Sequence, residues 1–291
     1  MHFCNLVTKI KNNRKILLNL FLIFLIYEFV IYLLTFLTNY HDLRAPLGNF
    51  SLIASLIRWD SFHYLEIIGN GYTYPHMAFF PLYPLLVKFL NLFIGNIILS
   101  AVIISWVSLF LAIFFLFKLI VLKFKDKNIA YLSIIFLLIF PFAIFYSTIY
   151  TEALFLFLTV AAFYFLEKRN WLLVGLFACL ASATRIFGIL LFVVFLLVYL
   201  SDKKFNLKKI DKKLLFILLA PLGLVFYMVF LQIKFGDPFI FLKAQKEWAS
   251  WGAFTVPWQT LSRQFRLLFD FNLLKNISVS GYFSHFRDFF F

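Results

Sequence analysis

Asp60 and His63 are the side chains best placed for acid–base chemistry, because they lie one helical turn apart in a stretch that predicts an amphipathic helix. This expected helix covers residues 50–68, and its apolar stripe includes Ile57. Asp60 lies three residues after Ile57 and falls on the same stripe. A carboxylate among apolar neighbours has a raised pKa unless a cation pairs with it, and a raised pKa suits a general base. The alternative is that Asp60 only pairs with Arg58 or caps a helix.

The composition places these side chains in a membrane protein. Of the 291 residues, 64% are hydrophobic and only 14% are charged. A soluble domain is typically about 45–50% apolar and about 25% charged, so this chain has too little polar surface for a soluble globule. Disordered and collagen-like chains are excluded for the same reason. We therefore expect an all-α fold, a polytopic bundle of transmembrane helices that forms a single membrane-embedded unit over residues 1–291.

Seven apolar stretches predict about seven to eight membrane helices. They cover about residues 16–37, 97–122, 129–147, 152–166, 171–184, 186–200 and 214–234. At 1.5 Å per residue the first stretch reaches about 33 Å, which is enough for a hydrocarbon core of about 30 Å. Residues 78–94 are short and carry two prolines, so they predict a re-entrant or interfacial helix.

Basic residues mark the loops expected on the cytoplasmic side. Four clusters hold 15 of the 27 Lys and Arg residues: Lys9, Lys11, Arg14 and Lys15; Lys123, Lys125 and Lys127; Lys168 and Arg169; and Lys203, Lys204, Lys208, Lys209, Lys212 and Lys213. The bilayer therefore accounts for the net charge of +14, and we expect no nucleic-acid partner. With all four clusters inside, the N-terminus is cytoplasmic in a multi-pass protein of the cell membrane. Residues 38–77, Glu152, Arg185 and residues 235–260 then lie on the extracytoplasmic side.

Four motifs follow one another within residues 50–260. They are Arg58-Trp59-Asp60 with His63-Tyr64 and Ala78-Phe79-Phe80-Pro81; Tyr150-Thr151-Glu152; Thr184-Arg185 with Gly188; and Phe235-Gly236-Asp237-Pro238 with Gln245 and Trp248. In this order they resemble the signature of the PIG-V-type mannosyltransferases, a GPI mannosyltransferase 2-like family of the GT-C membrane glycosyltransferases. Members of the family usually continue through further membrane helices, whereas this chain stops at Phe291. We therefore expect a fragment or a short variant.

The resemblance implies transfer of a hexose, mannose in this family, from a polyprenyl- or dolichyl-phosphate donor to a hydroxyl of a glycan or lipid acceptor. The reaction would take place on the extracytoplasmic face, with inversion. Carried over to this chain, Asp60 in the first outer loop, residues 38–77, is the general base. His63 and Glu152 are the other catalytic candidates. Glu152 either orients sugar hydroxyls or His63, or serves only as a structural partner of Arg185.

The leaving group of such a reaction is a lipid phosphate, which needs a cation near the membrane surface. Arg185 is the candidate, because an arginine at the broken end of a span is costly without an anionic partner and its planar fork suits phosphate. The alternative is that Arg185 pairs with Glu152 to join two helices. The remaining substrate-binding candidates are Arg58, Trp59, Tyr64, Gln245 and Trp248, and for Trp248 an interfacial aromatic belt is the competing explanation.

Several common site types are missing from the sequence. It contains no Asp-x-Asp pair, no glycine-rich phosphate loop and no cluster of His and Cys. We therefore expect no bound metal and no cofactor, with the lipid-phosphate sugar as a donor substrate. Two functions from other classes remain as alternatives: a secondary transporter or lipid-linked sugar flippase, and a non-catalytic membrane subunit. A transporter usually shows repeat symmetry and polar groups at the membrane midplane, whereas the polar motifs here gather at one face.

Overall fold

The computed structural model describes residues 2–41, 56–57 and 59–248. Every regular element in these residues is an α-helix or a short 3-10 helix, which confirms the predicted all-α class. The contacts within the chain divide it into two units, residues 1–244 and 245–291. Helices α1 to α10, which end at Phe235, all belong to the first unit.

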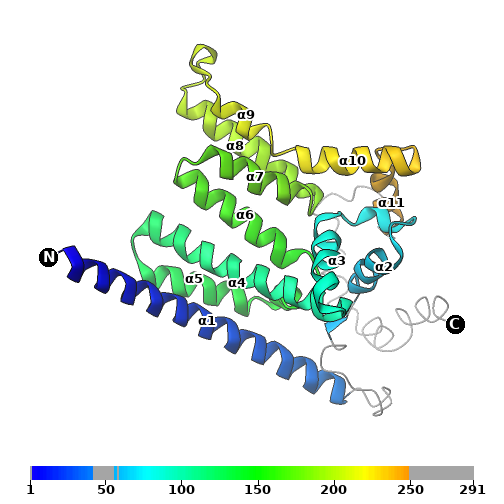
Figure 1. The fold of residues 1–291 in the computed structure, drawn as a ribbon, viewed down its shortest axis with the longest axis horizontal. Helices are drawn as coiled ribbons and strands as arrows, with labels where there is room; N and C mark the ends of the chain where they lie inside the picture. The colour runs from blue at the N-terminus through cyan, green and yellow to red at the C-terminus, as the bar shows by residue number, and fades with distance from the viewer. Residues whose placement is uncertain (1, 42–55, 58, 249–291) are drawn as a thin grey trace, which may run out of the picture. The chain divides into compact units, whose positions relative to one another are not determined.

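The α-helices follow one another as shown in Figure 1, with short 3-10 helices between them. Their bounds are α1 His2–His41, α2 Ser61–Asn70, α3 Leu82–Ile94, α4 Ile97–Phe124, α5 Lys127–Ile139, α6 Glu152–Glu167, α7 Trp171–Ser182, α8 Ile189–Asp202, α9 Lys213–Ile217, α10 Leu222–Phe235 and α11 Ile240–Trp248. The 3-10 helices are η3 His76–Ala78, η4 Pro141–Tyr146, η5 Ile186–Gly188 and η6 Leu207–Lys209.

Two of these helices are long and apolar enough to cross a membrane. They are Asn13–Leu37 within α1 and the whole of α4, and the number rises to three if α10 and Ile240–Lys246 of α11 form one bent span. Four shorter apolar helices among the described residues have 10–17 residues; for example, the 13 residues of α3 reach only about 20 Å. The two long apolar helices support a membrane protein. The helix lengths do not confirm the count of seven to eight crossings, which stays a prediction.

Two expected spans are shorter than predicted because prolines interrupt them. The stretch 129–147 is helical only to Ile139, since Phe140 before Pro141 takes the extended conformation that a residue preceding proline prefers. The stretch 214–234 is divided into α9 and α10, with Pro221 directly before the first residue of α10. Proline lacks the amide hydrogen that a continuous helix would need at that position.

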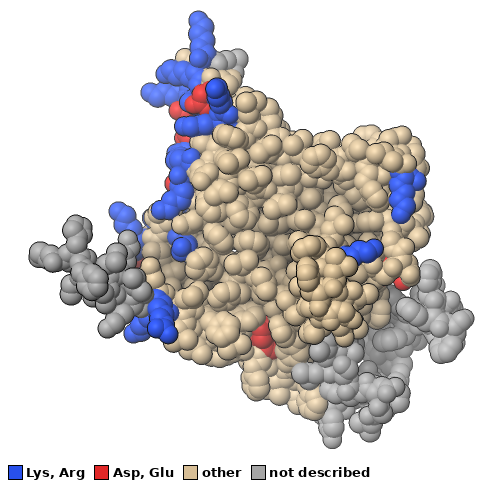
Figure 2. Space-filling model, in the orientation of Figure 1, with Lys and Arg blue, Asp and Glu red and all other residues tan. Residues whose placement is uncertain are grey.

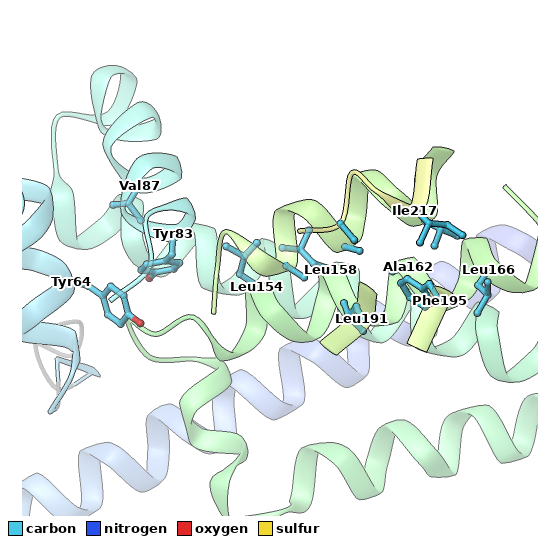
Figure 3. Packing of buried hydrophobic residues seen from close by; sticks show 14 of the residues in the cluster. Tyr64, Tyr83, Val87, Leu154, Leu158, Ala162, Leu166, Leu191, Phe195 and Ile217 are labelled. Carbon is cyan, nitrogen blue, oxygen red and sulfur yellow. The ribbon is translucent and has the colours of Figure 1, made fainter. Parts of the chain in front are cut away.

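The hydrophobic core is built around α6, which packs between α4 and α7. One face of α6 contributes side chains at a spacing of four residues, which is the helical repeat. Figure 3 shows them in a row that begins near Tyr64 and Tyr83. They are Leu154, Leu158, Ala162 and Leu166. This packing fixes the start of α6, where Glu152 lies, relative to the α2 and α3 segments.

Basic side chains gather at the other end of the helices. Figure 2 shows Lys and Arg over the α4–α5 turn, the α6–α7 turn and the α8–α9 connection, next to a broad surface with few charges. Two ion pairs join these ends: Lys123 to Glu167 at 3.1 Å, and Arg169 to Asp202. The three predicted clusters beyond the first helix therefore lie together, as a common membrane side requires.

Glycines allow α7 to pack very closely against its neighbours. A Cβ atom on Gly175 would lie 1.8 Å from the carbonyl oxygen of Phe216, just before α9 ends. A Cβ atom on Gly223 in α10 would lie 2.0 Å from the carbonyl oxygen of Cys179. Backbone atoms cannot yield to such contacts, so only glycine permits these helix approaches.

We predict that Gly175→Ala lowers the thermal midpoint of unfolding of the detergent-solubilised protein, because overpacking typically costs about 1–3 kcal/mol. The matched control is Gly69→Ala in α2, where a Cβ atom would have nothing within 4 Å. A thermal-shift series measures both variants beside the wild type. Equal midpoints for Gly175→Ala and Gly69→Ala would contradict the close approach of α7 and α9.

Candidate active site

Asp60 lies at the N-terminus of α2, which begins later in the sequence than predicted. The helix expected over residues 50–68 begins at Ser61 in the described part of this region, which excludes residues 42–55 and 58. Trp59 has a backbone φ of 40°, which residues other than glycine rarely adopt. This conformation interrupts a right-handed helix directly before Asp60. Asp60 is the N-cap residue, but its side chain makes no capping hydrogen bond. The carboxylate is therefore not used as a cap.

Three sequence motifs meet at this point through hydroxyl groups. The backbone amide of Asp60 donates a hydrogen bond of 3.0 Å to the phenol oxygen of Tyr150. The Tyr64 hydroxyl lies 3.2 Å from the Thr151 hydroxyl. Arg185 donates a hydrogen bond of 3.3 Å to the same Thr151 hydroxyl and forms an ion pair with Glu152. We call these residues the polar network: Asp60, Tyr64, Tyr150, Thr151, Glu152 and Arg185.

Helix ends hold the members of the polar network in place. Thr151 is the N-cap of α6 and Glu152 is its first residue. Arg185 follows the end of α7 in an extended conformation. Two residues before it, the carbonyl of Ala183 accepts a hydrogen bond of 3.0 Å from the amide of Leu82 at the start of α3. A Cβ atom on Gly188 would lie 2.4 Å from the backbone of Ala181, so this glycine allows the tight turn that carries Arg185.

The surroundings of Asp60 change its proton affinity. Although the side chain reaches the protein surface, burial raises the pKa of Asp60 above its ordinary value. The negative charge of Glu152 raises it further, and Arg185 acts in the opposite direction. A carboxylate with a raised pKa binds a proton more readily, which is the property required of a general base.

His63 lies on α2 one turn after Asp60. Its ring stacks on Phe79 at a centroid distance of 5.1 Å and lies 5.2 Å from the ring of His76. Burial, with a smaller contribution from His76, lowers the pKa of His63 to about 4. His63 is therefore a neutral imidazole near pH 7. It can exchange hydrogen bonds with a bound molecule, and it adds no positive charge to the site.

Glu152 has one oxygen engaged and one available. Oε1 pairs with Arg185, whereas Oε2 is buried and has no hydrogen-bond partner among the described residues. Buried polar atoms are nearly always satisfied, so a vacant acceptor beside an arginine indicates a place for a ligand hydroxyl. The pair with Arg185 is the structural alternative named above, and the vacant oxygen leaves a role in substrate binding open to Glu152 as well.

The other predicted site residues are distributed differently. Arg58 lies outside the described residues. Trp59 is 59% exposed, and its ring lies 5.8 Å from that of Phe145. Gln245 and Trp248 lie on α11 and belong to the unit of residues 245–291. In the parts of the chain that are described, no group of three His, Cys, Asp or Glu side chains is placed to hold a metal ion, and the expected lack of a metal stays a prediction.

Two members of the polar network were not among the predicted site residues. Tyr150 and Thr151 carry neutral hydroxyl groups, so a search for ionisable side chains passes over them. Their position in the motif Tyr150-Thr151-Glu152, directly before an apolar helix, was the available signal. In the structure they join the Asp60 segment to Glu152 and Arg185.

An apolar groove of about 550 Å³ lies between α2, α3, α7 and α10. Ile67 and Ile68 of α2 and Ala183 before Arg185 contribute to its wall, so it adjoins two of the segments that carry the polar network. Its two charged residues are Lys88 and Lys234. The Lys234 amine lies over the rings of neighbouring phenylalanines in α10, at 5.4 and 5.8 Å. The groove thus combines a long apolar surface with two cations.

Comparisons with known proteins agree with the motifs. Residues 45–244 match the family model described as "Mannosyltransferase (PIG-V)". The chain is 30% identical over 161 residues to a protein of Rattus norvegicus named GPI alpha-1,6-mannosyltransferase 2, a match that covers 50% of this chain and 33% of the relative. A protein of the same name from Cricetulus griseus is 32% identical over 150 residues, covering 47% of this chain and 30% of the relative.

These matches span about one third of the length of the curated relatives. No solved structure matches the chain. The family model, in contrast, covers well over half of the chain and includes all the described members of the polar network. On that match the chain belongs to the PIG-V mannosyltransferase family.

Proposed function

We propose that this chain is an integral membrane glycosyltransferase that transfers a hexose, mannose by its family, from a polyprenyl- or dolichyl-phosphate donor to a hydroxyl of a glycan or lipid acceptor. Transfer inverts the anomeric carbon and takes place on the extracytoplasmic face. The observation that carries the proposal is the polar network, in which Asp60 lies beside the Glu152–Arg185 pair at the end of α6 away from the basic clusters. The names of the two curated relatives support mannose as the sugar.

Asp60 acts as the general base in this proposal. It takes the proton from the acceptor hydroxyl while that oxygen attacks the anomeric carbon of the donor sugar. The absence of a capping bond to its side chain leaves the carboxylate available for this proton. His63, as a neutral imidazole one turn away, forms hydrogen bonds with the acceptor or the sugar.

Arg185 stabilises the leaving lipid phosphate. Its pair with Glu152 holds the guanidinium in one orientation, and the donors that Glu152 and Thr151 do not occupy face the phosphate oxygens. The charge that develops on the leaving phosphate strengthens this interaction during the reaction, which is the condition for catalysis. Glu152 Oε2, which has no partner in the described chain, accepts a sugar hydroxyl.

The groove between α2, α3, α7 and α10 accommodates the first isoprene units of the donor. Its wall is almost wholly apolar, as a prenyl chain requires, and Lys88 and Lys234 supply charge for the phosphate. In this proposal the phosphate lies against the part of the groove wall formed by Ala183, which is two residues before Arg185 in the chain. The donor thus approaches the polar network from the lipid phase.

The basic clusters support the proposed orientation in the membrane. Because Lys and Arg accumulate in cytoplasmic loops, the end with the α4–α5 and α6–α7 turns faces the cytoplasm in this proposal. The start of α1 lies at the same end (Figure 1). The polar network then faces the extracytoplasmic side of a multi-pass protein of the cell membrane. Donor, acceptor and bilayer are its partners in this proposal.

We predict that Asp60→Asn lowers mannosyl transfer by roughly 10²–10⁴-fold, the usual contribution of general base catalysis. The assay supplies membranes with radiolabelled polyprenyl-phosphate mannose and a panel of lipid and glycan acceptors, and counts label in the acceptor. The matched control is Glu66→Gln, the same chemical change at an exposed carboxylate of α2 that accepts a bond from Asn70. Transfer by Asp60→Asn at the wild-type rate would exclude Asp60 as the base.

We also predict that transfer increases with pH through the raised pKa of Asp60 and then levels off, because only the ionised carboxylate accepts a proton. Arg185 lowers this pKa and Glu152 raises it. In pH–rate profiles Arg185→Gln should therefore move the acidic limb to higher pH, and Glu152→Gln should move it to lower pH. If the acidic limb moved in the same direction in both variants, the electrostatic coupling of Asp60 to Arg185 and Glu152 would be contradicted.

Orientation is tested by cysteine labelling. In a protein with Cys4→Ser and Cys179→Ser, we predict that Phe62→Cys reacts with a membrane-impermeant maleimide on intact cells and Asn206→Cys reacts only after the membrane is opened. Labelling is read by mass shift on a gel. Reaction of both cysteines in intact cells would place the polar network and the basic end on the same side and would overturn the proposed orientation.

A further inference from the structure

A second groove lies at the basic end of the helices, and the proposed transfer reaction does not use it. It has a volume of about 870 Å³ and is formed by the beginning of the membrane span of α1, the last turns of α4 and the end of α6. Its apolar wall consists of Ile16, Leu17, Phe114, Phe117, Val121 and Leu122. Four cations line the same groove: Arg14, Lys118, Lys125 and Lys168.

The helical repeat of α4 places apolar and basic side chains together in this groove. Phe114, Lys118, Leu122 and Lys125 follow at intervals of three or four residues, so they lie on one face of the helix. Lys168, one turn after Tyr164, faces the groove from the end of α6. Three segments that are distant in the sequence therefore direct positive charge toward one apolar surface.

The four cations have no carboxylate to balance them within the groove. Its lining contains no Asp or Glu. The nearest acids in the sequence are engaged elsewhere: Glu167 pairs with Lys123 at 3.1 Å, and Asp126 accepts a bond of 2.7 Å from the amide of Asn128. Two of the lysine amines instead lie over aromatic rings. The Lys118 amine is 4.7 Å from the ring centroid of Phe114, and the Lys168 amine is 6.0 Å from that of Tyr164. Like charges clustered beside an apolar surface repel one another and are poorly solvated, so a bound anion would stabilise them.

The depth of Lys118 matches that of a lipid phosphate. Lys118 lies 21 residues after Ile97, the first residue of α4, which is about 32 Å along the helix axis. A hydrocarbon core is about 30 Å thick, so with Ile97 at one boundary Lys118 lies at the other. Lys125 is two turns further on, about 10 Å beyond the hydrocarbon edge. Lys118 and Lys125 therefore span the headgroup layer, and Phe114 and Phe117 of the apolar wall lie below Lys118.

We propose that this groove binds one anionic glycerophospholipid, with its phosphate among Arg14, Lys118, Lys125 and Lys168 and its acyl chains along the apolar wall. A free phosphate ion would satisfy the charges and leave the apolar wall exposed, whereas a neutral phospholipid would cover the wall and leave the charges unbalanced. An anionic lipid satisfies both. The bound lipid links α1, α4 and α6 at the end opposite the polar network.

Native mass spectrometry of the full chain in detergent tests this site. The protein is titrated with dioleoyl phosphatidylglycerol, dioleoyl phosphatidylcholine or inorganic phosphate, and the bound molecules are counted. The groove variant carries Arg14→Gln, Lys118→Gln, Lys125→Gln and Lys168→Gln. The control variant carries Lys204→Gln, Lys208→Gln, Lys209→Gln and Lys212→Gln, which removes the same charge from the loop between α8 and α9.

We expect the wild type and the control variant to hold one phosphatidylglycerol tightly, and the groove variant to bind it at least about tenfold more weakly. Phosphatidylcholine and inorganic phosphate should not form this tight adduct with any of the three. If the fourfold groove variant does not fold, as judged by its thermal midpoint, the single variant Lys118→Gln should still bind phosphatidylglycerol more weakly than the single variant Lys208→Gln does.

Equal loss of phosphatidylglycerol from the groove and control variants would reduce the effect to general basic charge and overturn the proposal. Binding of phosphatidylcholine as tight as that of phosphatidylglycerol would remove the role of the cations. Binding of inorganic phosphate as tight as that of the lipid would remove the role of the apolar wall. Undiminished phosphatidylglycerol binding by the groove variant would place the lipid elsewhere.

Discussion

The ion pair between Glu152 and Arg185 is the interaction on which the polar network depends. In a chain with 14% charged residues, a glutamate and an arginine at the ends of apolar helices are costly unless each has a partner. Their pairing joins the start of α6 to the segment after α7, and Thr151 extends the link to Tyr64 of α2. Removal of either charge would leave the other exposed to an apolar environment. The same pair sets the electrostatic surroundings of Asp60, with one charge raising its pKa and the other lowering it.

Much of the polar network could be predicted from the sequence, because its charged members stand out in an apolar chain. Asp60, Glu152 and Arg185 remain when the basic clusters are assigned to the opposite end, and the structure brings the three together. The start of α2 could not be predicted from its hydrophobic pattern, since an apolar stripe gives no sign of the positive φ of Trp59 that interrupts the helix. Tyr150 and Thr151 were passed over because their importance lies in hydrogen bonds between distant segments.

Helix lengths were predicted less well than helix positions. The hydrophobic pattern places α4 and the span in α1 closely, but a run of apolar residues continues across Pro141 and Pro221 where the helix does not. The close packing of α7 shows a further limit. Gly175 and Gly223 permit contacts with Phe216 and Cys179 that no local pattern indicates. Such contacts depend on how helices meet, and hydropathy describes only one segment at a time.

We propose that the polar end of the first unit performs transfer and that its basic end holds an anionic lipid. The central claim is that the donor phosphate binds at Arg185, beside Asp60. The most direct measurement is an experimental structure of the protein with a non-transferable polyprenyl-phosphonate analogue of the donor. The account predicts the phosphonate at hydrogen-bond distance from Arg185, with the anomeric carbon directed toward Asp60 and the prenyl chain along α10. A phosphonate bound among Lys118, Lys125 and Lys168 instead, with the polar network vacant, would contradict it.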